Sequence, residues 1–286
     1  MEWIERLNGA ITYIEKHLTD EVDYEQIAKI ACCSTYHFQR MFSYMADVPL
    51  SEYIRRRRMS MAAVELQSGN EKVIDVGLRY GYASPTAFNR AFQKVHGITP
   101  SQAKEDGVTV KAFPPISFKI TIKGEAEMNY RIEKKEAIRI IGASIPLYKE
   151  VEKNFAMVPK LWDDCAKNGT VQKLAGLMKN EPMGVLGVSV CNEQEDWKYF
   201  FAVANRDDSV DGFDEYTIPA STWAIFPGEG AMPTSIQELE KRIVTEWLPT
   251  SGYEYANAPD MEVYLNADPQ NAKYEVWIPV TKKEAK

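Results

Sequence analysis

In the first hundred positions, apolar residues recur at the three- and four-residue spacing of amphipathic helices. A short helix predicted over 76–82 is broken at Gly81, and a new helix starts after Ser84, with Pro85 at its first position and Gly97 beyond its end. Helix, glycine turn and helix with a polar outer face form the outline of a helix-turn-helix. The same spacing predicts three further helices, over residues 3–18, 24–31 and 50–67.

The pattern that begins at Ser84 occurs a second time, fifty positions earlier in the chain. Residues 34–42 read STYHFQRMF and residues 84–92 read SPTAFNRAF, so both copies keep a serine, two phenylalanines and an arginine in the same places. A single match would be weak, because any two helices can be joined by a glycine turn. Two copies joined by a long helix predict a paired DNA reader whose recognition helices are held about one turn of DNA, roughly 34 Å, apart.

Polar and aromatic side chains on the outer faces of the two predicted recognition helices are candidates for DNA contacts. An arginine in the major groove can bond to guanine O6 and N7 at once, and its neighbours can reach base edges, thymine methyl groups or phosphates. The alternative interpretation is that these residues form the solvated faces of two small helices. The candidates are Tyr36, Gln39 and Arg40 in the first copy and Thr86, Asn89 and Arg90 in the second.

The formal net charge of −7 argues against nucleic acid only until it is divided along the chain. Residues 26–106 carry eleven Lys or Arg against seven Asp or Glu, a balance of +4, whereas residues 1–25 carry −5 and residues 107–286 carry −6. The positive charge therefore lies around the recognition helices, where phosphate binding requires it. Residues 55–58 are four arginines that point to all sides of one helix, so some could contact phosphate while others pair with acids.

From residue 129 onward, strand-like runs alternate with helices. Strand, helix, strand, strand occurs twice, which predicts an α+β domain of two similar halves with a cleft between them. Its boundaries follow from a change in the sequence pattern over 107–127, which contains Pro114, Pro115 and a strand-like SFKITI at 117–122. We therefore expect a DNA-binding domain at 1–106, a linker at 107–127 and a ligand-binding domain at 128–286. The predicted elements of the two halves are residues 130–145, 151–167, 183–190 and 198–204, then 221–226, 235–248, 261–266 and 274–280.

The composition of the chain and the spacing of its cysteines and histidines argue against several function classes. With 45% apolar and 26% charged residues the chain is globular, and without an apolar run of eighteen residues or a signal-peptide plan we expect a cytoplasmic protein with no membrane partner. Neither the cysteines nor the histidines have the spacing of a metal site or a catalytic triad, so no metal, cofactor or catalytic residue is predicted. His96 ends a predicted helix, where a positive charge is favoured. The cysteines and histidines considered are Cys32, Cys33, Cys165, Cys191, His17, His37 and His96.

The C-terminal region is rich in aromatic residues with carboxylates nearby. In YEVWIPV at 274–280, alternation places Glu275 and Trp277 on one face of a strand. A carboxylate beside an indole suits an organic cation, through charge and cation–π attraction. The alternative is that Glu275 is a surface charge and the aromatic residues are core. The predicted ligand-binding residues are Glu275, Trp277, Trp223, Tyr255, Tyr216 and Trp162.

Residues 3 to 104 resemble the DNA-binding domain of the AraC/XylS transcriptional regulators. The repeated Phe-x-Arg-x-Phe, the helix between the copies and the run YGYASPTAFNRAFQKVHGITP carry the resemblance. It implies base contacts from the six candidates named above. Two positions differ from the usual pattern: Asp47 replaces a glycine after the first recognition helix, and Pro85 stands where relatives often carry a polar side chain.

Residues 128–280 are similar to the GyrI-like effector domain of Rob-type and multidrug-responsive regulators. The runs IRIIGASIP, STWAIFPGEG, TEWLPTSGYEY, MEVYLN and YEVWIPV carry this second resemblance. In that family a glutamate on the last strand lines the ligand cleft, and Glu275 is the matching position. Together the resemblances imply a transcription regulator that binds double-stranded DNA, an aromatic or cationic amphipathic effector and, as a possible further partner, RNA polymerase.

Two other function classes stay open at this point. Some GyrI-like proteins resemble hydrolases, and Glu275 with Tyr255 or Tyr216 would then do acid–base chemistry, although no catalytic histidine accompanies them. The C-terminal domain, which is acidic, could instead be a docking domain for a protein partner.

Overall fold

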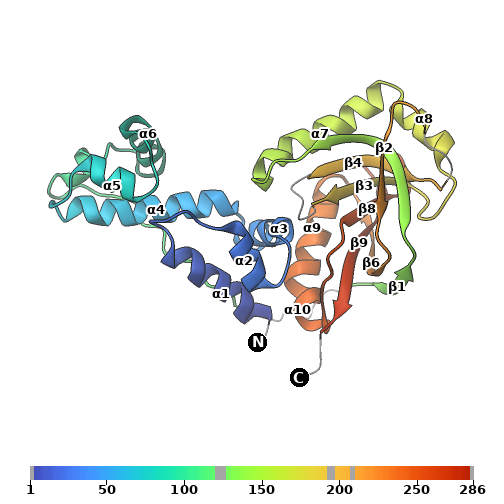
Figure 1. Ribbon diagram of the computed structural model, residues 1–286, viewed down its shortest axis with the longest axis horizontal. Coiled ribbons are helices and arrows are strands. Elements are labelled where there is room, and N and C mark those ends of the chain that lie inside the picture. The colour runs from blue at the N-terminus through green and yellow to red at the C-terminus, as the bar shows by residue number, and fades with distance from the viewer. Residues whose placement is uncertain (1–2, 120–126, 192–196, 207–209, 284–286) are drawn as a thin grey trace. The chain divides into compact units, whose positions relative to one another are not determined.

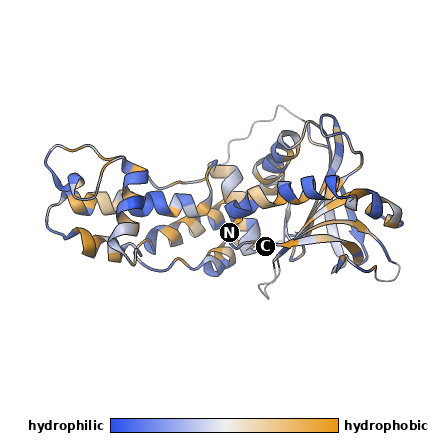
Figure 2. Cartoon of the chain, turned by 90° about the horizontal axis from the view of Figure 1, so that it is seen from above, coloured by the Kyte–Doolittle hydropathy of each residue, from blue (hydrophilic) through white to orange (hydrophobic). Residues whose placement is uncertain are grey.

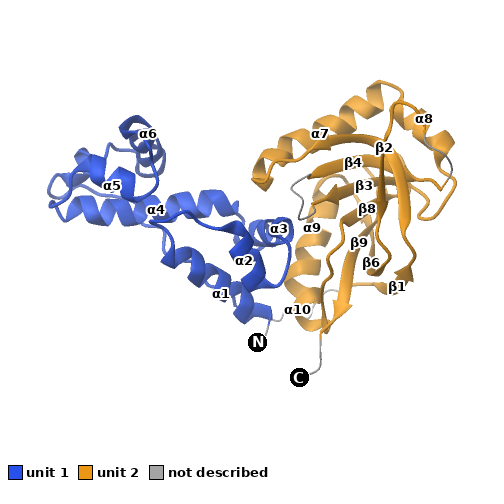
Figure 3. Cartoon of the chain, viewed as in Figure 1, with its two compact units in different colours: residues 1–119 blue, residues 120–286 orange. Residues whose placement is uncertain are grey.

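The structure, a computed structural model, describes residues 3–119, 127–191, 197–206 and 210–283. The chain divides into two compact units, 1–119 and 120–286, coloured separately in Figure 3. The N-terminal unit is helical, and the C-terminal unit combines one large sheet with helices.

Six α-helices build the N-terminal unit, and two pairs of them form the predicted helix-turn-helix copies. The first copy is α2 with α3, the second is α5 with α6, and α4 lies between them in the chain (Figure 1). The helices are α1 (Trp3–Lys16), α2 (Tyr24–Ala31), α3 (Thr35–Ala46), α4 (Leu50–Gln67), α5 (Val73–Arg79) and α6 (Pro85–His96), and a 3-10 turn (Gln102–Lys104) follows.

The two recognition helices, α3 and α6, begin and end alike. Ser34 Oγ accepts a hydrogen bond from His37 N at 3.2 Å, and Ser84 Oγ accepts one from Ala87 N at 3.2 Å. The residue after each helix is left-handed, at φ 52° for Asp47 and φ 82° for Gly97. Asp47 therefore adopts the conformation for which a glycine is usual, so this departure from the family pattern leaves the turn intact.

Apolar helix faces supply the core of the N-terminal unit. Phe88 and Phe92 of α6 pack with Met59 of α4, while Phe42 of α3 lies 5.3 Å from Tyr53 of α4 between ring centroids. Hydrophobic and hydrophilic residues alternate around these helices in Figure 2. The long helix α4 thus contributes to both helix-turn-helix copies.

Nine strands form one antiparallel sheet in the C-terminal unit, in the order β1-β6-β9-β8-β3-β4-β2-β5, with β7 paired to β9. The strands are β1 (Arg131–Lys135), β2 (Ile138–Pro146), β3 (Val185–Val190), β4 (Lys198–Ala204), β5 (Asp214–Ile218), β6 (Ser221–Gly230), β7 (Tyr253–Tyr255), β8 (Asp260–Tyr264) and β9 (Ala272–Lys282). The helices are α7 (Val151–Lys167), α8 (Thr170–Leu177), α9 (Thr234–Arg242), a π-helical turn (Ile243–Trp247) and α10 (Leu248–Thr250).

The predicted repetition of strand, helix, strand, strand is confirmed. One half is β2-α7-β3-β4, the other is β6-α9-β8-β9, and β3 pairs with β8 where the halves meet. The elements α8, β5 and β7 were not predicted. Of the strand expected at 117–122, residues 117–119 are not a strand and the rest lie outside the described residues.

The register of the strands assigns every side chain to one of two faces, because residues opposite each other in paired strands share a face. On the helix-covered face, Phe201 packs with Cys165 and Leu174 from α7 and α8. On the other face, here called the inner face, Trp223 and Trp277 join a core that includes Ile218 from the far end of the sheet. One register row of the helix-covered face is Phe226, Val276, Glu262, Gly187 and Phe201.

Candidate DNA-binding and effector-binding sites

Each set of predicted DNA contacts lies along one side of one recognition helix. Thr86 and Arg90 are exposed on α6, and Asn89 is half-buried between them. They project from the side of the helix opposite its buried residues, which include Phe88 and Phe92. These three side chains can reach a partner together.

The first set has more contacts within its own helix. Arg40 Nε donates to Tyr44 Oη at 3.2 Å, and the Arg40 guanidinium lies 6.0 Å from the ring centre of Tyr36 and 5.8 Å from that of Tyr44. Tyr36 and Gln39 are buried, and Arg40 is half-buried. Which members of either set contact bases stays a prediction.

The four consecutive arginines on α4 each have partners within the N-terminal unit. Arg55 and Arg56 pair with Glu52, Arg57 pairs with Glu15, and Arg58 donates to the carbonyl oxygens of Leu18 at 2.9 Å and Asp20 at 2.7 Å. The prediction that the run points to all sides of the helix is confirmed. Arg57 joins α4 to α1 and Arg58 joins α4 to the residues after α1, whereas Arg55 and Arg56 pair within α4; these structural roles require no phosphate.

The structure divides the six predicted ligand-binding residues between the two faces of the sheet. Trp223 and Trp277 belong to the inner face, and Tyr216 packs against the same cluster. Trp162 instead projects from α7 onto the helix-covered face, and Tyr255 lies on β7 opposite Val280. The six residues therefore do not form one site.

On the inner face, Glu275 is held by an arginine that the sequence analysis did not single out. Arg131 Nη1 donates to Glu275 Oε1 at 2.8 Å and Nη2 to Oε2 at 3.1 Å, while Trp277 Nε1 donates to Oε2 at 2.8 Å. The predicted alternation of Glu275 and Trp277 is thus confirmed. The hydrogen bonds from Arg131 to Glu275 raise the pKa of the Arg131 guanidinium. A cation bound to Glu275 would have to replace Arg131.

On the helix-covered face, Trp162 belongs to a second group of aromatic residues around a carboxylate. Its ring centroid lies 4.6 Å from Phe201 and 4.5 Å from Tyr264, both edge-on, and its Nε1 donates to Tyr199 Oη at 2.9 Å. Tyr264 Oη in turn donates to Glu262 Oε2 at 2.9 Å. We call Trp162, Tyr199, Phe201, Glu262 and Tyr264 the aromatic–carboxylate cluster.

A glycine makes this cluster possible. A Cβ atom on Gly187 would lie 2.3 Å from Tyr199 Oη and 3.0 Å from Glu262 Oε2. The missing side chain leaves the space into which the tyrosine hydroxyl and the carboxylate both extend from neighbouring strands. Gly187 lies directly opposite Glu262 in the register of the central strand pair, β3 with β8.

Glu262, Tyr264 and Tyr199 were not predicted as site residues from the sequence. Alternation in MEVYLN puts Glu262 and Tyr264 on one face of a strand. A charged residue on a strand at the centre of a sheet was the available signal, since a buried carboxylate needs partners. That β8 is a central strand follows only from its pairing with both β3 and β9.

In the ranges that the structure describes, no three His, Cys, Asp or Glu side chains are grouped so as to hold a metal ion. None of the helices in these ranges is both long and apolar enough to cross a bilayer.

Two family models match this chain, one in each of its two units. Residues 131–280 match the family model described as integron-associated effector binding protein, and residues 27–106 match a helix-turn-helix domain model. The transcriptional activator AarP of Providencia stuartii is 41% identical over 95 residues, which cover 33% of this chain and 70% of AarP.

Two further relatives differ in how much of the chain they match. The regulatory protein SoxS of Salmonella typhimurium is 35% identical over 91 residues, covering 32% of this chain and 85% of SoxS. The right origin-binding protein of Escherichia coli K12 is 24% identical over 294 aligned positions, covering 96% of this chain and 97% of that protein. The similarity to the right origin-binding protein thus extends through both units.

Proposed function

This chain belongs to the family of integron-associated effector binding proteins and carries an AraC-type helix-turn-helix domain, and from this premise we propose which residues read DNA and which bind the effector. The protein is a DNA-binding transcription regulator with an effector-binding domain. The proposal concerns the chemistry of the two sites.

For DNA, we propose that α3 and α6 enter successive major grooves of one site. Phosphate contacts supply most of the affinity, and base edges set the register. Tyr36, Gln39 and Arg40 read one half of the site, while Thr86, Asn89 and Arg90 read the other. The exposure of Thr86 and Arg90 on α6 supports the second half of this assignment, whereas Tyr36 and Gln39 in the first half are buried.

For the effector, the aromatic–carboxylate cluster on the helix-covered face is the observation that carries the proposal. Trp162, Tyr199 and Tyr264 surround the place where the half-buried Glu262 extends over Gly187. Aromatic faces and a carboxylate both attract an organic cation, and partial burial strengthens that attraction. We propose that the effector is an aromatic cation bound at this cluster.

Glu275 is the second candidate for the effector's charge. Its position beside Trp277 favours it, and its two hydrogen bonds from Arg131 oppose it, because a cation would gain the carboxylate only by displacing the guanidinium. That Trp223, Tyr216 and Tyr255 contact the effector also stays a prediction. The two glutamates can be compared directly, since each accepts a hydrogen bond from one aromatic side chain.

Tryptophan fluorescence tests the assignment with a charged and a neutral ligand of similar shape. Methyltriphenylphosphonium and triphenylphosphine oxide are titrated into the full chain, wild type, Glu262→Gln and Glu275→Gln. We expect saturable quenching by the phosphonium, weakened about tenfold or more in Glu262→Gln and within about twofold in Glu275→Gln, because an ion pair in a partly buried site is worth about 1.4 kcal/mol or more.

Each other result has a definite meaning. Loss of binding in Glu275→Gln alone would move the site to the inner face. Equal binding of both compounds would make the effector apolar and the glutamates structural. If neither compound bound and the chain bound a protein partner instead, the docking alternative would replace the small-molecule proposal.

We further propose that the protein acts in the cytoplasm, where its DNA is, and that bound effector alters a surface offered to RNA polymerase. Such a change requires that the effector bind two states of the protein with different affinity. Transcription in vitro from a selected site, with and without the phosphonium, measures that coupling. The relatives are regulators by name, so the hydrolase alternative is not favoured.

A further inference from the structure

Residues 108–118 follow α6 and the 3-10 turn as an extended segment that contains no helix or strand, and we call this segment the strap. Pro114 and Pro115 lack backbone N–H groups, and among residues 3–119 the structure shows no strand that could bond the others. Backbone polar groups that leave water still need partners. The strap finds them in side chains of α1, α4 and α6.

The beginning of the strap is bound to the second helix-turn-helix. Val108 O accepts from Gln67 Nε2 at 3.0 Å, and Lys111 N donates to His96 Nδ1 at 3.2 Å. His96 is the last residue of α6, and its Nε2 bonds Met59 O of α4 at 3.0 Å. One buried imidazole therefore joins the strap, the second recognition helix and α4.

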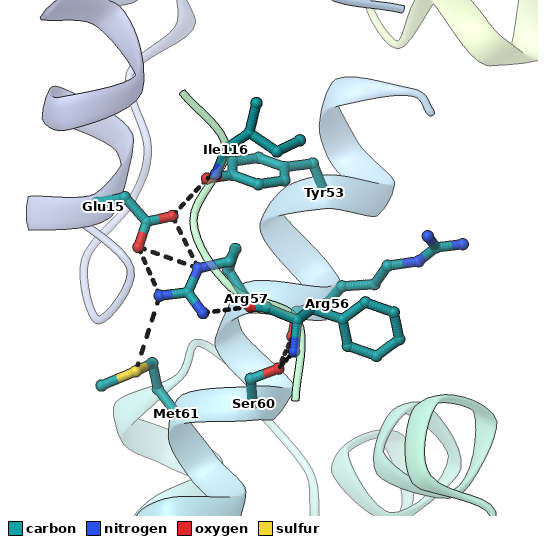
Figure 4. A network of polar contacts seen from close by, with 8 residues as sticks. Glu15, Tyr53, Arg56, Arg57, Ser60, Met61 and Ile116 are labelled. Carbon is teal, nitrogen blue, oxygen red and sulfur yellow. Dashed lines mark hydrogen bonds and ion pairs between the residues drawn. The ribbon is translucent and has the colours of Figure 1, made fainter. Parts of the chain in front are cut away.

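The middle of the strap is bound to α4 near Arg57 and Ser60 (Figure 4). Phe113 N donates to Ser60 Oγ at 3.0 Å, and Phe113 O accepts from Arg57 Nη1. The Arg57 guanidinium also pairs with Glu15 of α1, and Arg56 lies 5.2 Å from the centre of the Phe113 ring. The strap thus completes the coordination of a buried arginine.

The end of the strap is bound to the first helix-turn-helix and α1. Ile116 N donates to Tyr53 Oη at 3.3 Å, and the same hydroxyl donates to Glu15 at 2.6 Å. Phe118 exchanges two hydrogen bonds with the Asn8 amide, at 2.8 and 2.9 Å. The buried Phe118 ring lies edge-on to Phe42 of the first recognition helix at 6.0 Å.

These contacts run antiparallel to α4, from Gln67 to Tyr53, a length of roughly 21 Å at 1.5 Å per residue. The strap is therefore a second connection between the two helix-turn-helix copies, beside α4 itself. Because side chains accept and donate its hydrogen bonds, replacing one that belongs to α1 or α4 loosens the strap at one point without altering a residue of either recognition helix.

We infer that the strap is a positioning element for DNA binding, which fixes α3 and α6 at the separation that two successive grooves require. The inference rests on the proposed use of both recognition helices on one duplex. Two binding elements joined rigidly at the correct span bind far more tightly than the same elements joined loosely. Asn8 and Ser60 are the positioning residues that the test addresses.

The test compares full and half sites. A duplex is selected from a random library with the wild-type full chain, and two derivatives are made, one with half of the site scrambled and one with a base pair inserted between the halves. The variant Asn8→Ala/Ser60→Ala releases the strap at two points. Thr12→Ala/Ser68→Ala is the matched control, because these hydroxyls bond carbonyl groups of their own helices.

We expect the strap variant to bind the full site about tenfold more weakly, to bind the half site within about twofold of wild type, and to lose less on insertion of the extra base pair. The control should match wild type on all three duplexes. Equal weakening on full and half sites, or none, would overturn the inference, since general destabilisation acts on both. Circular dichroism checks folding, and Ser60→Ala with Ser60→Thr as its rescue replaces the double variant if that variant unfolds.

One outcome concerns the proposed function itself. If the wild-type chain binds the half site as tightly as the full site, two-helix reading fails and the strap inference fails with it. A wild type that needs both halves, together with an unaffected strap variant, overturns the strap inference alone.

Discussion

In each unit, within the residues that the structure describes, a guanidinium bonds both carboxylate oxygens of one glutamate. Arg57 bonds Glu15 through Nε and Nη2 at 2.9 and 2.7 Å, and Arg131 bonds Glu275 through Nη1 and Nη2 at 2.8 and 3.1 Å. The two guanidinium groups differ in exposure, 9% for the Arg57 side chain and 43% for the Arg131 side chain, while the two carboxylates are alike, 19% for Glu15 and 15% for Glu275.

The difference in exposure, rather than in geometry, decides what each pair does. Removing one member of a buried pair leaves the other charge without compensation, whereas an exposed pair exchanges its partner for water at little cost. Burial beside the Glu15 carboxylate also raises the pKa of the Tyr53 hydroxyl, so this hydroxyl stays a donor. The Arg57 guanidinium is therefore held by burial on several sides, whereas the Arg131 guanidinium is held by its carboxylate partners.

Arg57→Ala should have the largest effect. It leaves Glu15 and the Phe113 carbonyl without their guanidinium, and we expect the free energy of unfolding of the N-terminal unit to fall by about 3 kcal/mol or more. Urea unfolding followed by the helical circular dichroism signal measures this. The neighbouring Arg56→Ala, which removes a more exposed side chain, should cost less than about 1 kcal/mol; equal losses would contradict the comparison.

Arg90→Ala extends the comparison to an arginine that is exposed on α6. We expect binding to the selected duplex to weaken by about 1–3 kcal/mol with relaxed preference at one base pair, while stability stays within about 0.5 kcal/mol. Titrations against selected and random duplexes measure both. Arg90→Lys should retain the phosphate term but lose the bidentate bond. Equal weakening on the two duplexes would make Arg90 a phosphate contact.

His96 supplies a smaller, pH-dependent effect. Desolvation lowers the pKa of this buried histidine, and the Lys111 charge lowers it further. The prediction that His96 places a positive charge at the end of α6 is therefore wrong. The folded state then binds fewer protons than the unfolded state, and stability is lost as pH falls below about 6.5. The unfolding midpoint of wild type should drop more between pH 7.5 and 5.5 than that of His96→Gln, and parallel profiles would refute this.

Arg131→Ala should have the smallest effect on stability, less than about 1 kcal/mol, because the guanidinium is partly solvated. Its sharper readout is ligand binding. If a cation can reach Glu275 at all, removing its competitor should strengthen phosphonium binding in a Glu262→Gln background. Glu133→Ala, which removes the other carboxylate bonded to Arg131, is the control. Unchanged binding would confine the effector to the helix-covered face.

Most of the local structure could be predicted from the sequence. The bounds expected for α2, α4, α7 and β4 agree with those observed, and Ser34 and Ser84 cap the helices as expected. Helix starts and stops depend on residues within a few positions of one another, so one sequence suffices to locate them. Short elements such as β5 and β7 were missed, because their pairing partners rather than their own composition make them strands.

By itself the sequence determined two helix-turn-helix copies, two similar halves of the C-terminal unit and the alternation that places Glu275 beside Trp277. Only the tertiary structure decided that Glu275 accepts hydrogen bonds from Arg131 while Glu262 accepts one from Tyr264 above Gly187, and that residues expected as a linker lie bound along α4. The physical reason is distance along the chain. A strand's own pattern states which residues share a face, but the register with strands far away in sequence decides what that face meets.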